Sequence, residues 1–424
     1  MQIVRADGVA EQARIDEMKQ RAAKNNAQID RAVADILQDI AENGYAAVEK
    51  YSLQFDGAAP REITGEELDK AVAQCQPDVV DALRQAEENI RSYHEKMLVS
   101  TWEYERRPGE RLGQLVRGLR RVGIYVPGGT AAYPSSVLMN AVPAKVAGVQ
   151  EIIMVTPPTE NLNVAVLAAA RIAGVDRVIA VGGVQAIGAL AHGAGFIPRV
   201  DKIVGPGNAY VASAKRQVFG LVDIDMIAGP SEVLVIADKT ANPVYVAADL
   251  LSQAEHDVLA SVTLVTDDMA LAQQVKQQAE EQMEQLERRD IMKQSWEQFG
   301  SILVFDSLAD ACRMANEIAP EHLEIYTENP RDLLPLIENA GAIFLGGYAP
   351  EPLGDYMAGP SHVLPTSGTA RFFSPLSVDT FLKKTSLIEY TPAALERVSD
   401  QVIALARNEK LTAHANSILV RFPK

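Results

Sequence analysis

The chain has 424 residues, which is too long for one ordinary domain and predicts two or three. Hydrophobic residues make up 47% of it and charged residues 23%, the balance of a globular protein rather than a disordered one. A net charge of −16 argues against a general basic surface for nucleic acid. No apolar run reaches the roughly 18 residues of a membrane span, and the N-terminus lacks the apolar core of a signal peptide. We therefore expect a cytoplasmic protein without nucleic-acid or membrane partners.

The first hundred residues are predicted to be mostly helical. Apolar residues recur at helical spacing from Ile29 to Ile40, and Asn43 and Gly44 give a stop signal. A second helix is expected after Thr64 and a third over residues 78–97. This part of the chain is therefore predicted to be an α-helical entry.

Short apolar strands and helices alternate from residue 122 onward. The first alternation has strands at 122–126, 151–155, 177–181 and 202–205 and helices at 135–142, 163–173, 184–191 and 209–218. The second has strands at 232–237, 261–265, 301–305, 323–326 and 342–345, with a polar helix at 269–289 and another helix at 309–318. Such alternation is typical of parallel α/β sheets.

The predicted fold class is α/β, with two Rossmann-like doubly wound domains, a helical N-terminal region and a small helical C-terminal segment. We expect residues 1–20 to form an N-terminal arm. Residues 21–124 plus 233–375 are expected to form the first α/β domain, and residues 125–232 the second. The final segment, 376–424, has one clear helix at 392–408 and is too small to hold a core alone, so it should pack on something else, such as another subunit.

Three glycine-containing turns place backbone amides where helices begin. They are Gly128-Gly129, Gly182-Gly183 and the turn at residues 205–208. A pyrophosphate can bind at such positions. The usual G-x-G-x-x-G pattern is missing, so a plain loop and a cofactor site remain equal interpretations of the turn at 205–208.

Gln253 and His256 are spaced to lie on one face of a helix, where they offer two convergent ligands to a metal or a polar substrate. In isolation, such a pair is more often a hydrogen-bonded polar pair, and glutamine is a poor zinc ligand. Asp355, in a Gly-Asp-Tyr turn, and His414, near the C-terminus, offer the oxygen and imidazole that a borderline divalent metal takes.

Glu321 and His322 put a carboxylate and an imidazole on adjacent residues at the start of a strand. An imidazole, with a pKa of about 6.5, is the natural proton shuttle at neutral pH, although a capped strand start explains the pair equally well. His362 lies in a Gly/Pro-rich loop suited to touching a polar ligand. Cys75 and Cys312 have no partner pattern, which favours buried thiols in a reducing compartment over a nucleophile at Cys312.

Seven stretches, in the family's order and over nearly the whole chain, resemble the histidinol dehydrogenase family. They are IYVPGG (124–129), GPGN (205–208), AGPSE (228–232), LLSQAEH (250–256), APEHL (319–323), GDY (354–356) with HVLPT (362–366), and LTAH (411–414). Any one of them is weak, whereas seven together are highly specific.

The resemblance implies two successive oxidations, from L-histidinol through L-histidinal to L-histidine, the last steps of histidine biosynthesis, with two NAD⁺ reduced and one Zn²⁺ per subunit. By position, the zinc ligands are Gln253, His256, Asp355 and His414, and the acid/base pair is Glu321 and His322. Substrate contacts correspond to Ser231, Gln253, His256, His322, Asp355, His362, Glu409 and His414, and cofactor contacts in the NAD-binding domain, 125–232, to Tyr125, Gln185 and Asn208.

The resemblance also implies a homodimer whose C-terminal segment crosses to the partner, so that His414 and Glu409 act in trans. Two other functions stay open. A related oxidoreductase of another alcohol would keep the same machinery, although Glu409 and His362 argue against it. A non-redox metal hydrolase, or a binding protein with an inactive site, would need no dinucleotide, and the glycine-containing turns disfavour it.

Overall fold

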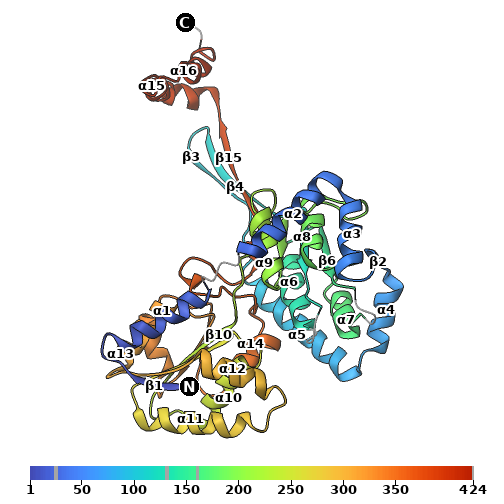
Figure 1. Cartoon of the computed structure of the whole chain (residues 1–424). Coiled ribbons are helices and arrows are strands. Elements are labelled where there is room, and N and C mark those ends of the chain that lie inside the picture. The colour runs from blue at the N-terminus through green and yellow to red at the C-terminus, as the bar shows by residue number, and fades with distance from the viewer. Residues whose placement is uncertain (23–26, 129–132, 159–161, 423–424) are drawn as a thin grey trace.

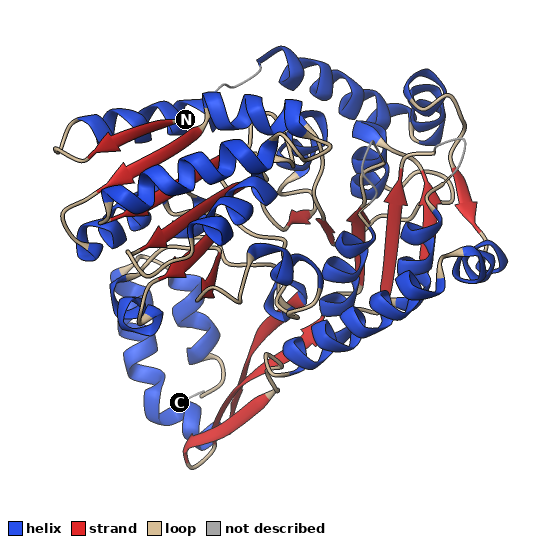
Figure 2. Cartoon of the chain, turned by 90° about the horizontal axis from the view of Figure 1, so that it is seen from below, coloured by secondary structure: helices blue, strands red, loops and turns tan. Residues whose placement is uncertain are grey.

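The computed structural model describes residues 1–22, 27–128, 133–158 and 162–422, so the predicted turn residue Gly129 lies outside the described residues. Within them, the strands form two six-stranded sheets and one three-stranded sheet. Figure 1 shows two lobes, each built on one large sheet, and an arm that projects away from them. Helices lie on both faces of each large sheet (Figure 2).

The first large sheet, called here the β5 sheet, has the order β2-β7-β6-β5-β8-β9. Its strands are β2 (Arg61–Ile63), β5 (Arg121–Tyr125), β6 (Glu151–Thr156), β7 (Arg177–Ala180), β8 (Lys202–Val204) and β9 (Asp223–Ile224). Its connecting helices are α6 (Pro134–Val146), α7 (Val164–Ile172), α8 (Gly183–His192) and α9 (Ala209–Val218). Only β2 is antiparallel to its neighbour, so the predicted doubly wound arrangement is confirmed.

The second large sheet, called the β10 sheet, has the order β1-β12-β11-β10-β13-β14 and is parallel throughout. Its strands are β1 (Gln2–Arg5), β10 (Glu232–Ala237), β11 (Ser261–Thr266), β12 (Gly300–Val304), β13 (His322–Tyr326) and β14 (Ala342–Leu345). Its helices are α10 (Pro243–Ala254), α11 (Met269–Met283), α12 (Arg289–Gln298) and α13 (Leu308–Ile318). The helix predicted over 269–289 therefore ends early, and a second one follows because Met292 and Trp296 are buried against this lobe.

The N-terminal helices cover the β5 sheet, whereas we expected residues 21–124 to join residues 233–375. The helices are α2 (Ala27–Asn43), α3 (Tyr45–Phe55), α4 (Gly65–Gln74) and α5 (Pro77–Glu95). α2 and α3 pack against α8, and α4 and α5 pack against α7 and α6. The observed contacts differ from the expected grouping because the apolar face of a helix can be recognised in the sequence, whereas the sheet that this face covers cannot.

Residues 1–20 do not form a separate arm either. β1 extends the β10 sheet by pairing with β12, and α1 (Ala10–Ala22) follows it. Ile15 of α1 packs with Leu303 and Met314. The lobe of the β10 sheet is therefore built from both the start and the second half of the chain.

The projecting arm consists of a three-stranded antiparallel sheet and two terminal helices. They are β3 (Trp102–Arg107), β4 (Glu110–Gly118), β15 (Leu382–Tyr390), α15 (Pro392–Asn408) and α16 (Thr412–Leu419). α15 matches its predicted range, but the sheet was not predicted. Its strands β3 and β15 are largely polar and exposed, so no buried face marks them in the sequence.

Short helices complete the chain between β14 and the arm. They are η1 (Pro330–Leu336), α14 (Glu351–Tyr356), η2 (Thr369–Arg371) and η3 (Val378–Phe381). Within the described parts of the chain, no helix combines the length and the apolar character needed to cross a membrane.

Candidate active site and metal centre

Glu321 and His322 lie at the amino edge of the β10 sheet, where β13 begins. α13 ends at Ala319, which adopts a left-handed conformation (φ 52°) and turns the chain toward the sheet. His322 then pairs in register with Val233 of β10. Ligand sites of open α/β sheets usually lie at the carboxyl edge, so the position of this pair could not be inferred from the fold class.

The backbone around Glu232 fixes the tautomer of His322. His322 Nδ1 lies 2.9 Å from the carbonyl oxygen of Glu232. A carbonyl only accepts hydrogen bonds, so Nδ1 carries the proton and Nε2 of the neutral ring carries the lone pair. Burial lowers the pKa of His322 to about 4, which keeps the ring neutral at pH 7. His322 is thus a base whose free nitrogen faces the site.

Glu321 is held by the same segment. Its Oε2 accepts the N–H of Glu232 at 2.9 Å and lies 3.7 Å from His322 Nδ1. The side chain is buried, and this burial raises the pKa of Glu321 well above its usual value. Ser231, the predicted substrate contact just before Glu232, is half-buried at the same edge.

Gln253 and His256 come from the end of α10. The helix ends at Ala254, so His256 lies just beyond it rather than on its face, and its N–H donates to the carbonyl oxygen of Gln253 at 3.2 Å. Gln253 is 0% exposed, and within the described part of the chain neither its Oε1 nor its Nε2 has a hydrogen-bond partner. Burial lowers the pKa of His256, an effect that the nearby Asp355 opposes.

Asp355 lies in helix α14, not in the predicted turn. Glu351 begins this helix after Pro350, so Glu351 and Asp355 share one face at i, i+4 spacing. Ligand atoms of His256, Glu351 and Asp355 all lie within 4.8 Å of one another. Sequence analysis missed Glu351, although the Glu-x-x-x-Asp spacing was a signal for it once α14 was recognised as a helix.

Glu351 also approaches the acid/base pair. Its Oε1 lies 3.8 Å from His322 Nε2 and has no hydrogen-bond partner among the residues that the structure describes. Burial, followed by the charge of Asp355, raises the pKa of Glu351 to about 9. The cluster of His256, Glu351 and Asp355 and the Glu321–His322 pair therefore form one continuous site.

His362 connects this site to the other lobe. Its Nδ1 lies 3.2 Å from Asp355 Oδ1, and its Nε2 lies 3.4 Å from the hydroxyl of Ser136 in the first turn of α6. Asn89 of α5 donates to the carbonyl oxygen of Met357 at 2.8 Å and so holds the start of the same loop. The site thus lies where the amino edge of the β10 sheet meets the N-terminus of α6.

The donor set suits a borderline divalent metal such as zinc. It offers the imidazole of His256, the carboxylates of Asp355 and Glu351, and the amide of Gln253. Buried amides normally find hydrogen-bond partners within the protein. The Gln253 amide lacks one among the described residues, so its oxygen is free to accept from a ligand or an ion.

His414 and Glu409 do not join the site of their own subunit. Both are exposed on the projecting arm, in α16 and directly after α15. Figure 1 places these helices far from α10 and α14. The described residues of one chain therefore bring the ligand atoms of two predicted metal ligands, His256 and Asp355, together with Glu351, while Gln253 lies three residues before His256 at the end of α10.

Tyr125, Gln185 and Asn208 all lie at the carboxyl edge of the β5 sheet. The hydroxyl of Tyr125 accepts the N–H of Gly183 at 3.2 Å, and Gln185 Nε2 donates to Asp56 Oδ2 at 3.0 Å. The side chain of Asn208 caps α9 by accepting two backbone N–H groups. Burial raises the pKa of Tyr125.

The turn after β8 runs against the end of β5. A Cβ atom added to Gly205 would lie 2.2 Å from the carbonyl oxygen of Tyr125, so the backbone passes closer there than any other residue allows. α9 begins directly after this turn, and two of its first N–H groups, those of Tyr210 and Val211, donate to the side chain of Asn208.

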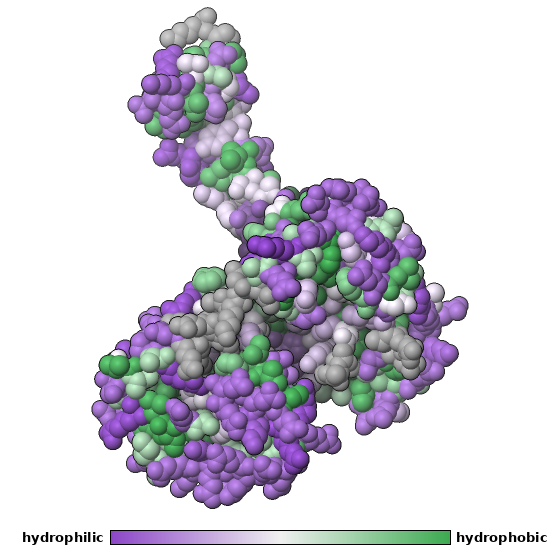
Figure 3. All heavy atoms as spheres, viewed as in Figure 1, coloured by the Kyte–Doolittle hydropathy of each residue, from purple (hydrophilic) through white to green (hydrophobic). Residues whose placement is uncertain are grey.

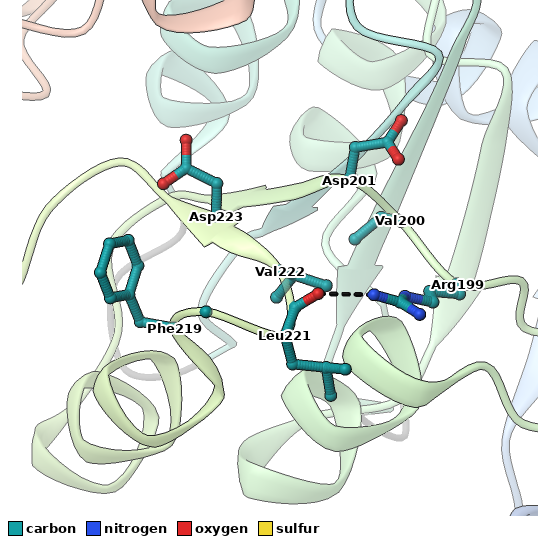
Figure 4. A pocket seen from close by; sticks show the side chains of 8 residues that line it. Arg199, Val200, Asp201, Phe219, Leu221, Val222 and Asp223 are labelled. Carbon is teal, nitrogen blue, oxygen red and sulfur yellow. Dashed lines mark hydrogen bonds between the residues drawn. The ribbon is translucent and has the colours of Figure 1, made fainter. Parts of the chain in front are cut away.

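Two other features carry no part of the site. A surface pocket of about 270 Å³ is lined by Arg199, Phe219 and Asp223 among others, at the amino edge of the β5 sheet (Figure 4). It contains none of the predicted site residues. Cys312 is packed in α13, and its burial raises its pKa to about 11, which supports a structural thiol over a nucleophile.

Comparisons with known proteins cover nearly the whole chain. The family model for histidinol dehydrogenase matches residues 19–422. The chain is 54% identical over 409 residues to histidinol dehydrogenase from Clostridium acetobutylicum, covering 96% of this chain and 95% of that protein. It is 53% identical over 415 residues to the one from Heliobacterium mobile, covering 96% and 97%.

The fold agrees with a solved structure as well. The crystal structure of histidinol dehydrogenase from Elizabethkingia anophelis matches with a TM-score of 0.93 and 37% identity, covering 99% of this chain and 98% of that one. The chain therefore belongs to the histidinol dehydrogenase family.

Proposed function

We propose that this chain is an NAD-dependent, zinc-containing enzyme that oxidises L-histidinol to L-histidinal and then to L-histidine, the end of histidine biosynthesis. The main support is the buried Glu321–His322 pair beside the cluster of His256, Glu351 and Asp355. A cytoplasmic location is part of the proposal, and the two buried free cysteines are consistent with it.

Gln253, His256 and Asp355 would hold the zinc, together with His414 of the partner subunit. When bound, the ion would fix the amine and imidazole nitrogens of the substrate and so orient the reacting carbon. Tyr125, Gln185 and Asn208 would contact NAD⁺, which supplies the hydride acceptor in both oxidations. His362, Ser231 and Glu409 of the partner subunit are proposed to touch the substrate.

In the first oxidation, His322 takes the proton of the substrate hydroxyl as the hydride leaves the same carbon. The neutral ring has its lone pair on Nε2, the nitrogen 3.8 Å from Glu351, which supports this role. The C–O bond becomes a carbonyl, so the product is the aldehyde and one proton resides on His322.

In the second oxidation, Glu321 takes a proton from water as the water oxygen bonds to the aldehyde carbon, and the protonated His322 returns its proton to the aldehyde oxygen. Burial makes the Glu321 carboxylate a stronger base because it raises the pKa of this group. The hydrated aldehyde then loses its second hydride, and His322 again accepts the hydroxyl proton. Retention of the aldehyde in a site between two lobes keeps it from solvent.

Single-turnover kinetics test the two roles separately. His322→Asn should slow both oxidations by 10²-fold or more, about the size of a lost general base. Glu321→Gln should slow mainly the aldehyde step, which can be measured by supplying L-histidinal. If Glu321→Gln impaired only the first hydride transfer, the assignment of Glu321 would be wrong.

Metal removal tests the cofactor. Dialysis against a chelator should remove about one equivalent of zinc per chain and abolish NADH formation from L-histidinol, and zinc addition should restore both. A panel of other amino alcohols serves as the substrate control. Full activity of a protein shown by elemental analysis to lack metal would refute the zinc site.

We further propose a homodimer in which the projecting arms are exchanged. The arm carries His414 and Glu409 away from their own site. It also exposes apolar residues, with Ile388 75%, Leu405 65% and Val420 61% exposed, and Figure 3 shows hydrophobic patches along it. Burial of this surface against a second chain supplies a driving force for assembly.

A further inference from the structure

A closed ring of polar contacts surrounds Gly205 at the carboxyl edge of the β5 sheet. Lys215 Nζ donates to the carbonyl oxygen of Gly205 at 2.8 Å. The N–H of Gly205 donates to Asp225 Oδ2, also at 2.8 Å. Lys215 and Asp225 form an ion pair with each other, so both backbone polar groups of Gly205 are held by one pair of side chains.

This ion pair is buried, since the side chains of Lys215 and Asp225 are only 4% and 1% exposed. The desolvation of two buried charges offsets most of the free energy of their attraction, so buried ion pairs contribute little to stability on average. A pair that also clamps a backbone turn is better explained by the local geometry that it enforces. The turn has little room to vary, because Gly205 has φ +106° and lies so close to β5 that an added Cβ would stand 2.2 Å from the carbonyl oxygen of Tyr125.

The clamp joins three elements around the predicted cofactor contact Asn208. Gly205 follows β8, Lys215 is in α9, and Asp225 follows β9. Asn208 caps α9 three residues after Gly205. Asp225 Oδ1 also accepts the N–H of Met226 at 2.6 Å, where the chain begins its crossing to Ser231 in the other lobe.

We propose that Lys215 and Asp225 are positioning residues for the dinucleotide, which hold the turn at residues 205–208 in its binding conformation before the cofactor arrives. The proposal rests on the proposed function, since it concerns NAD⁺ binding. Neither residue needs to touch the cofactor. If the turn is already ordered in the free protein, binding of the cofactor does not carry the entropic cost of ordering it.

The test variant is the double substitution Lys215→Met with Asp225→Asn. It removes both charges together, so no unpaired charge is left buried, and the Asn side chain still accepts the N–H of Gly205. We expect the Kd for NADH, measured by calorimetry or fluorescence, to rise about tenfold, which corresponds to about 1.4 kcal/mol. The KM for NAD⁺ should rise equally, while zinc content and kcat at saturating NAD⁺ stay unchanged.

The matched control is Lys145→Met with Asp176→Asn. This ion pair has the same chemistry in the same lobe, and Asp176 also accepts a backbone N–H, that of Ile152. It lies before β7, at the opposite edge of the sheet from the turn. NADH binding of the control should stay within twofold of the wild type.

Unchanged NADH affinity in a folded Lys215→Met/Asp225→Asn protein would overturn the proposal. Amide hydrogen exchange of the unliganded wild type gives a second test that needs no variant. The N–H of Gly205 should exchange as slowly as those of the neighbouring strand β8, and rapid exchange would also overturn the proposal. Failure of the wild type itself to bind NADH would refute the proposed cofactor, and this inference with it.

Discussion

The most unusual single residue of the site is Gln253. Its amide is fully buried and finds no hydrogen-bond partner in the described ranges of the chain, a situation that costs about 1–3 kcal/mol for a polar group. A residue that destabilises the protein in this way is retained where it binds a ligand rather than stabilises the fold. A substitution that removes this amide should therefore raise the stability of the metal-free protein and lower its affinity for the metal.

Gln253→Leu tests this opposition. The substitution removes the unsatisfied amide at similar volume, so urea unfolding of the metal-free variant should give a free energy of unfolding about 1 kcal/mol above wild type. Zinc affinity, measured by competition with a chelator, should fall at least about tenfold.

Gln185→Leu is the matched control, because this buried glutamine does have a partner, Asp56. The control should destabilise the protein, since it removes one of the two hydrogen bonds that Asp56 Oδ2 accepts, the other coming from the N–H of Gly182. A Gln253→Leu protein less stable than wild type, or one with unchanged zinc affinity, would show that Gln253 serves the fold instead.

At the scale of elements, the close approach of β5 and the turn after β8 sets the shape of the predicted cofactor edge. Gly205 and Gly220 both adopt positive φ, +106° and +99°. A Cβ on Gly205 would collide with the Tyr125 backbone, whereas a Cβ on Gly220 would meet nothing within 4 Å. A residue with a side chain would therefore be strained by the positive φ at either position, but only at Gly205 would its Cβ also collide with a neighbouring strand.

Alanine substitutions separate these two effects. Gly220→Ala should cost about 1–2 kcal/mol from its backbone conformation alone. Gly205→Ala should cost at least about 2 kcal/mol more, because the strands must also move apart. Thermal and urea unfolding measure both values, and equal costs would mean that the turn adjusts without displacing β5.

At the scale of the whole molecule, the position of the arm makes a prediction about assembly. If His414 and Glu409 complete the partner's site, each site combines the body of one chain with the arm of the other. A Glu321→Gln chain and a His414→Ala chain would then complement each other. A mixed dimer would contain one intact site and one doubly altered site.

The complementation experiment mixes the two inactive variants after reversible dissociation. Random reassociation of equal amounts makes half of the dimers mixed, so about a quarter of the wild-type activity should return. Each variant carried alone through the same procedure is the control. If the sites were completed within one chain, mixing would restore nothing.

The sequence by itself determined most of the elements of the two large sheets. Their periods of two and 3.6 residues are local, and caps such as Thr64 and Asn208 mark where helices begin. The groups able to do chemistry, above all Glu321, His322 and His256, were also visible, because their residue types and spacing carry the signal and the family resemblance adds to it.

Only the tertiary structure decided which elements meet. The N-terminal helices cover the β5 sheet, β15 pairs with β4 across more than 250 residues of chain, and the Glu321–His322 pair lies at an amino edge. Glu351 and the Lys215–Asp225 clamp emerged only there as well. Contacts between distant segments depend on complementary surfaces, and a one-dimensional pattern shows that a face is apolar or charged but not what it will touch.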